Sequence, residues 1–172
     1  AARAEETADA RLGNAVAGRG VHQRDAGVER AQQQRLRLGF RQAFVAELEQ
    51  LVFSPSRWER RLVPSTIATM THGSRRAGRG PEVVERALPL LGQLIGDAEP
   101  DVQKALAWAY RSIAQIDRKR TTAALREETE RAVATDDGHR AWVVRDALAK
   151  LDPNDADAIK TRLAGIRRRP GA

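Results

Sequence analysis

The sequence predicts an all-α fold in which antiparallel helix pairs are stacked on one another. From Phe40 onward, apolar residues recur every three or four positions, as they do on the buried face of a helix. Short turn sequences rich in Pro, Gly or Asp separate these periodic stretches. No segment alternates apolar and polar residues in the way that a half-buried strand does.

The periodic stretches define helices with short connections. A helix from about residue 40 to 52 ends at the turn Ser54-Pro55-Ser56, which also supplies the cap of the next helix. The second helix is expected over 57–71, with a kink or a fresh start at Pro64, and is followed by a Gly- and Arg-rich loop over 72–81. Further helices are expected over 81–95, 100–116, 121–134, 139–151 and 154–166. Such an array of antiparallel pairs is typical of a HEAT-like solenoid.

Apolar residues at helical spacing also predict the core of the helix that begins at Pro100. Its buried positions are expected to be Val102, Ala105, Leu106, Ala109, Ile113 and Ile116. Between the next two helices, the pair Asp136-Asp137 is expected to cap the helix that follows it.

The composition is that of one soluble domain with a substantial core. The chain has 172 residues, 41% of them hydrophobic, and it contains no cysteine, so disulfides and thiolate metal sites are excluded. There is no apolar run near the roughly 20 residues of a membrane span and no signal peptide, so we expect a cytoplasmic protein. The net charge of +7 favours binding to polyanions, nucleic acid above all, although a GC-rich genome would also produce a chain rich in Arg and Ala.

The N-terminal part differs from the rest of the chain. Residues 1–40 combine several glycines with mixed charges and show poor apolar periodicity, so an irregular or weakly helical segment is expected there. The chain opens on Ala1 rather than Met, which predicts a missing or processed N-terminus. The helical domain is expected over residues 41–169.

A tryptophan followed three residues later by an arginine occurs three times. Three residues are nearly one helical turn, so ring and guanidinium share a face, which suits a surface that offers apolar contact and binds an anion. The pairs are Trp58 with Arg61, Trp108 with Arg111, and Trp142 with Arg145.

The neighbours of each tryptophan and arginine in the sequence predict which of these side chains are exposed. Lys104 and Arg111 share a helix face with Trp108, which favours exposure of that ring over burial. Trp142 is flanked by valines and is expected in the core. The adjacent side chains of Arg60 and Arg61 point about 100 degrees apart around the helix, so at most one of them lies on the same surface as Trp58. We expect Arg61 to be that residue, and we expect Arg60 to be solvated or to pair with an acidic side chain.

Two of these motifs resemble the DNA alkylation repair family, the AlkD-like alkylpurine DNA glycosylases. The first is the stretch Ser54–Val63, which contains Trp58-Glu59-Arg60-Arg61, and the second is Asp101–Ser112, which contains Val102-Gln103-Lys104-Ala105 before Trp108 and Arg111. A third element, Trp142–Lys150, resembles the Arg-bearing helix near the end of the family's domain. The resemblance covers about residues 41–169.

The resemblance implies a HEAT-like surface that holds duplex DNA by its backbone and excises cationic N3- and N7-alkylated purines. It implies catalytic roles for Arg61 and Trp108. The family's second cleft tryptophan, with an aspartate four residues beyond it, has no counterpart before Arg61, and Asp25 stands near the expected position of the carboxylate. The residues expected to contact DNA are Arg61, Lys104, Trp108, Arg111, Arg145, Arg75 and Arg76.

No cofactor is expected, and His22, His72 and His139 lack the spacing of a zinc site. The expected partner is double-stranded DNA, bound by a monomer. Two alternatives remain open: a catalytically silent relative that binds distorted or alkylated DNA through shape and charge, and a helical-repeat scaffold for an acidic protein partner.

Overall fold

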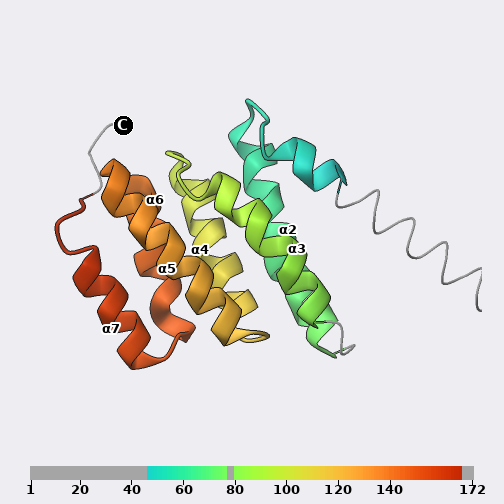
Figure 1. The fold of residues 1–172 in the computed structure, drawn as a ribbon. Coiled ribbons are helices and arrows are strands. Elements are labelled where there is room, and N and C mark those ends of the chain that lie inside the picture. Colours follow the sequence, from blue (N-terminus) through green and yellow to red (C-terminus); the bar gives the residue numbers. More distant parts are fainter. Residues whose placement is uncertain (1–45, 77–79, 168–172) are drawn as a thin grey trace, which may run out of the picture. The chain divides into compact units, whose positions relative to one another are not determined.

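The computed structural model describes residues 46–76 and 80–167, and all regular secondary structure in these ranges is helical (Figure 1). The chain divides into two compact units, residues 1–46 and 47–172. After a helical stretch over 46–51, the second unit contains α2 (Arg57–Arg76), α3 (Gly80–Leu94), α4 (Pro100–Ala114), α5 (Arg118–Thr135), α6 (Gly138–Ala147), a 3-10 turn η1 (Leu148–Lys150) and α7 (Pro153–Arg162). The prediction of an all-α fold is confirmed, whereas the segment expected over residues 1–40 lies outside the described residues.

The helices of the second unit are arranged in two layers. Helix α4 packs against α2 on one side and α6 on the other, and these three helices form what we call the even layer. Helix α5 packs against α3 and α7, and these three form the odd layer. Contacts of α2 with α3, and of α5 with α4 and α6, join the layers, so the apolar core lies between them.

Helix α4 is the centre of this packing. The core positions predicted on it from Val102 to Ile113 are all buried, and Leu106, Tyr110 and Ile113 are among the largest fully buried side chains. The expectation for Ile116 is wrong, because the helix ends at Ala114 and Ile116 is only half-buried. Because neighbouring helices cover the rest of its surface, α4 presents only one narrow stripe to solvent. The members of this stripe are Asp101, Lys104, Trp108, Arg111 and Gln115.

Helix α2 is longer than predicted and passes through Pro64 without interruption. Proline at this position removes one hydrogen bond, to the carbonyl of Arg60, and the buried side chains of Val63 and Ile67 hold the helix on both sides of it. The predicted loop over 72–81 is wrong at both ends, because residues 72–76 complete α2 and α3 begins at Gly80. The helical cost of Gly73, about 1 kcal/mol, is too small to stop a helix that is already packed.

Aspartates begin three of the helices. Asp117, Asp137 and Asp152 each accept a hydrogen bond from a backbone N–H in the first turn of α5, α6 and α7. The predicted cap from Asp136-Asp137 is confirmed for Asp137. Asp136 instead ends α5 in the left-handed conformation, with φ of 52 degrees.

A buried ion cluster joins α5 to the start of α6. Glu128, with 6% of its side chain exposed, accepts hydrogen bonds from Arg131 at 2.7 Å and from Arg140. Arg140 also donates to the carboxylate of Asp137 at 3.2 Å. The end of α3 comes close to this cluster, because a Cβ on Gly96 would lie 3.0 Å from Oδ2 of Asp137.

Substitution of Gly96 by alanine is expected to lower the free energy of unfolding by about 1–3 kcal/mol, as overpacking of a tight contact does. The added methyl group would displace the carboxylate that both caps α6 and binds Arg140. Urea unfolding of the variant measures the loss. Gly73→Ala is the matched control, because a Cβ there meets nothing within 4 Å and alanine favours a helix. Equal stability of the two variants would contradict the proposed close contact.

Candidate nucleic-acid interface

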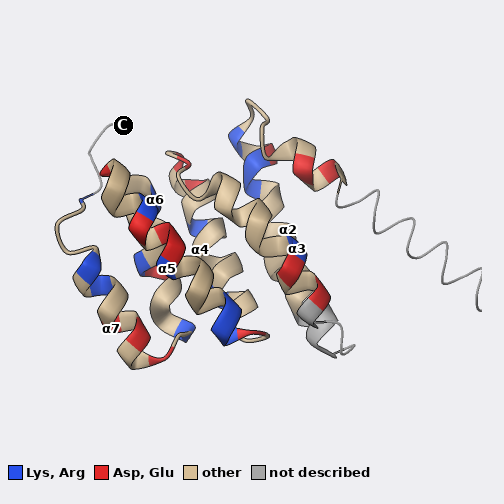
Figure 2. Ribbon diagram, in the orientation of Figure 1, with Lys and Arg blue, Asp and Glu red and all other residues tan. Residues whose placement is uncertain are grey.

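The three Trp/Arg pairs, which are far apart in the sequence, all lie in the even layer. Trp58 and Arg61 are on α2, Trp108 and Arg111 are on α4, and the third pair is on α6. Since α4 packs against both of the other helices, the pairs occupy adjacent helices. The start of α2 also carries a group of basic residues (Figure 2).

Trp108 is exposed, as its neighbours in the sequence predicted. The residue is 40% exposed, although it stands on a helix whose other faces are buried. Lys104, one turn earlier, is exposed as well, and Arg111, one turn later, is partly exposed. A large aromatic side chain held at the surface between two cations is an unusual use of a core helix and points to binding.

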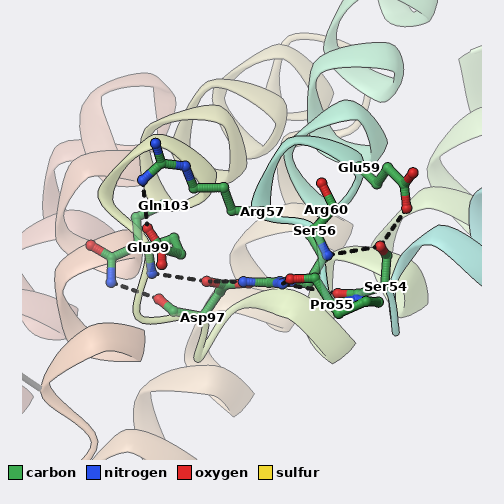
Figure 3. Close-up of polar contacts among 9 residues, drawn as sticks. All are labelled: Ser54, Pro55, Ser56, Arg57, Glu59, Arg60, Asp97, Glu99 and Gln103. Carbon is green, nitrogen blue, oxygen red and sulfur yellow. Dashed lines mark hydrogen bonds and ion pairs between the residues drawn. The ribbon is translucent and has the colours of Figure 1, made fainter.

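The structure separates the adjacent arginines of α2. Arg60 donates from Nε to Oδ2 of Asp97 at 2.6 Å and from Nη1 to the carbonyls of Ser54 and Pro55 at 2.9 and 3.1 Å (Figure 3). The hydrogen bond to Asp97 raises the pKa of the Arg60 guanidinium. Arg61 points elsewhere and is exposed, with its guanidinium carbon 6.0 Å from the centre of the Trp58 ring. The prediction that only one of the two shares the face of Trp58 is confirmed.

Asp97 and Gln103 connect the start of α2 with the rest of the even layer. The carboxylate of Asp97 binds Arg60 and accepts the backbone N–H of Glu99 at 2.9 Å, just before α4 begins (Figure 3). The side-chain amide of Gln103 donates to the carbonyl of Asp97 at 2.6 Å and lies 2.9 Å from Nδ1 of His139 on α6. The network therefore sets the positions of α2, α4 and α6 relative to one another.

Sequence reasoning missed this role of Gln103. The residue is fully buried, and its presence next to Val102, on the apolar side of α4, was a signal that a polar partner lies nearby. Its partners, at positions 97 and 139, come from the loop before α4 and from α6, so spacing along α4 gave no indication of them.

Trp58 was not predicted as a site residue, yet it is the more exposed of the first two tryptophans. The residue is 56% exposed, and the guanidinium carbon of Arg57 lies 4.8 Å from the centre of its ring. Arg57 also faces Glu99 at 3.6 Å. Cation–π contacts at these distances hold the guanidinium groups of Arg57 and Arg61 near the ring, where they form a basic patch.

Two further arginines of the even layer already have partners. Arg111 donates from Nη1 to both the carboxylate and the carbonyl of Asp146, each at 2.8 Å. Arg145 donates to the carbonyl of Leu163 at 2.6 Å and to that of Ile166, so it ties the end of α7 to α6. Contacts of Arg111 and Arg145 with DNA stay predictions, and they compete with the two acceptors of Asp146 for Arg111 and with two backbone carbonyls for Arg145.

The structure says less about the other residues that the sequence analysis singled out. Trp142, which was expected in the core, is half-buried. Arg75 and Arg76 belong to the last turn of α2, but their side chains are outside the description, as is the whole of Asp25.

Within the described ranges, no group of three His, Asp or Glu residues is placed to bind a metal ion, and no helix is long and apolar enough to cross a membrane.

The fold and this surface define a class: a helical-repeat protein whose even layer displays tryptophans beside cations. Comparison with protein families places it more narrowly. The model of a family described as DNA alkylation repair enzyme matches residues 27–151, well over half of the chain. The chain belongs to the DNA alkylation repair enzyme family, as the two motifs predicted, and this membership supports a role in DNA repair. No curated protein and no solved structure gave a significant match.

Proposed function

We propose that the protein binds duplex DNA on the exposed face of the even layer and excises N3- or N7-alkylated purines. The observation that carries this proposal is the stripe of α4, where Lys104, Trp108 and Arg111 follow one another among the few accessible residues of a mostly buried helix. Family membership supplies the kind of substrate, alkylated DNA.

The proposed reaction suits such a surface. An N3- or N7-alkylated purine is cationic, so the base leaves with the electron pair of the glycosidic bond and the positive charge moves to the sugar. An aromatic ring stabilises such a charge through its π face. Within the described residues no cation lies over the ring of Trp108, whereas Arg57 lies over that of Trp58. Of these two tryptophans, Trp108 is therefore the one whose ring we expect to contact the sugar.

The phosphate contacts are assigned to cations without a carboxylate partner. Arg61 and Lys104 are both exposed, and neither forms an ion pair with any residue in the described part of the chain. A guanidinium that is already placed beside Trp58 binds a phosphate oxygen at a lower entropic cost than a free one.

Replacement of Arg61 or Lys104 by alanine is expected to weaken duplex binding about 5- to 10-fold and to lower the slope of log affinity against log salt by about 1 for each residue. Fluorescence anisotropy with a labelled duplex between 50 and 200 mM salt measures both. Lys119→Ala is the control, because Lys119 is an exposed cation in the first turn of α5, in the odd layer. If Lys119→Ala changes the slope as much as Arg61→Ala, the DNA does not lie on the even layer.

Excision is tested by incubating the full chain with methylated duplex DNA and measuring release of 7-methylguanine and 3-methyladenine. Release supports the glycosylase. Tight, salt-dependent binding without release instead identifies a catalytically silent DNA-binding relative, which is favoured by the absence of any tryptophan before Trp58. If affinity for DNA is weak and nearly independent of salt, the scaffold for an acidic protein partner is the better description.

A further inference from the structure

We propose that Asp146 supplies the carboxylate of the active site and that Arg111 holds it in place. This inference rests on the proposed excision reaction, which requires a negative charge near the sugar and for which the family motifs identify no carboxylate in the described part of the chain. It assigns a catalytic role to a residue of α6 that lies 35 positions after Arg111 in the sequence.

Asp146 is both accessible and held in a defined position. Its side chain is 45% exposed, which leaves the carboxylate open to a ligand. Arg111 binds it through Oδ2 and also binds its backbone carbonyl, each at 2.8 Å, so the same guanidinium reaches two acceptors of one residue. A charge-assisted pair with a second bond to the backbone restricts the rotation of the side chain and prepares it for a ligand.

Arg111 connects Asp146 to the helix face that carries Trp108. Arg111 follows Trp108 by three residues on α4, so the two side chains are neighbours on one face of the helix. Asp146 contacts Arg111 from α6, the helix packed against α4. The side chain of Arg111 therefore joins the carboxylate to the exposed stripe of α4 that contains Trp108.

Other carboxylates of the even layer and of the turns beside it fit less well. Asp101 shares the stripe of α4 but precedes Trp108 by seven residues, about 10 Å along the axis. Glu59 binds the hydroxyl of Ser54, and Glu99 faces Arg57 at the start of α2. Asp146 is an exposed carboxylate that pairs with Arg111, the residue one turn after Trp108.

The chemistry assigned to Asp146 follows from the charges. As the bond between C1′ and the purine nitrogen breaks, both electrons leave with the base, which becomes neutral, and C1′ becomes cationic. The carboxylate stabilises this cation from one side while the Trp108 ring does so from another. Water then adds to C1′ and loses a proton to the carboxylate or to solvent, leaving a hydroxyl group on the sugar.

The test compares Asp146→Asn with wild type in single-turnover release of 7-methylguanine from methylated duplex. Asparagine keeps the size of the side chain and an acceptor for Arg111 but removes the charge, so we expect release to slow about 100-fold. Affinity for unmodified duplex should stay equal or rise, because a negative charge facing DNA is lost. Asp146→Glu restores the charge and should recover part of the rate. A purely structural role would instead lower duplex affinity and thermal stability in Asp146→Asn together with the rate.

Two further variants complete the experiment. Asp157→Asn is the matched control, because Asp157 is an exposed carboxylate that pairs with Lys160 on α7, in the odd layer. Asp25→Asn tests the upstream position. If wild type releases the base and Asp146→Asn does so at the same rate, the role of Asp146 is wrong although excision stands, and a loss confined to Asp25→Asn would move the carboxylate there. If wild type itself releases no base, both the excision and the role of Asp146 are overturned.

Discussion

Trp108→Ala is expected to lower the rate of 7-methylguanine and 3-methyladenine release about 30-fold. This corresponds to the loss of a desolvated contact between a cation and an aromatic face, worth about 2 kcal/mol. The effect should fall on the chemical step, because the positive charge on the sugar develops only as the glycosidic bond breaks. Single-turnover release from methylated duplex, with enzyme in excess, isolates that step from product release.

The controls for this prediction separate chemistry from folding and from phosphate binding. Trp108 is 40% exposed and the rest of it is packed, so its truncation should lower the thermal midpoint, and release is compared at a temperature well below that of the variant. Trp108→Phe keeps a π face and should retain most of the rate. Trp58→Ala removes the ring that lies beneath Arg57 and should weaken duplex affinity more than it slows release. A Trp108→Ala variant that binds weakly but releases bound base at the wild-type rate would contradict the assignment.

Glu128→Ala is expected to destabilise the fold by about 3 kcal/mol, the largest change in stability that we predict. The carboxylate of Glu128 is almost inaccessible and binds Arg131 and Arg140, so its removal leaves Arg140 in a partly buried site with Asp137 as the remaining acid. Tyr110 lies fully buried in the same region, where burial above all, and then the charge of Glu128, raises its pKa. Urea unfolding monitored by circular dichroism measures the change.

Glu130→Ala is the matched comparison for Glu128→Ala. Glu130 also lies on α5 and forms a two-pronged pair with Arg162, which lowers the pKa of the carboxyl group, but both side chains are more than half exposed. Solvent and salt screen such a pair, so the urea midpoint should hardly move. If the two variants were equally stable, the Glu128 cluster would contribute no more than a surface ion pair.

The sequence was sufficient to predict the helices, most of the core of α4 and the family. These rest on local signals: apolar residues every three or four positions, turn residues between them, and two motifs in a fixed order. The errors lay at helix ends, as in α2, where packing of the apolar face carried the helix five residues further than the glycine suggested. The relation of Trp108 to Lys104 was also local, since the period of one helix determines it.

The sequence by itself thus determined that this is an all-α member of a DNA alkylation repair family with tryptophans and arginines one turn apart. Only the tertiary structure decided which arginines near the tryptophans have an acidic partner. The sequence showed that Arg60 and Arg61 diverge, but the partner of Arg60 is an aspartate 37 residues away. Likewise, the partner of Arg111 comes from another helix, 35 residues later. Helical periodicity orients a side chain on its own helix, whereas the charges that it meets depend on how the helices stack.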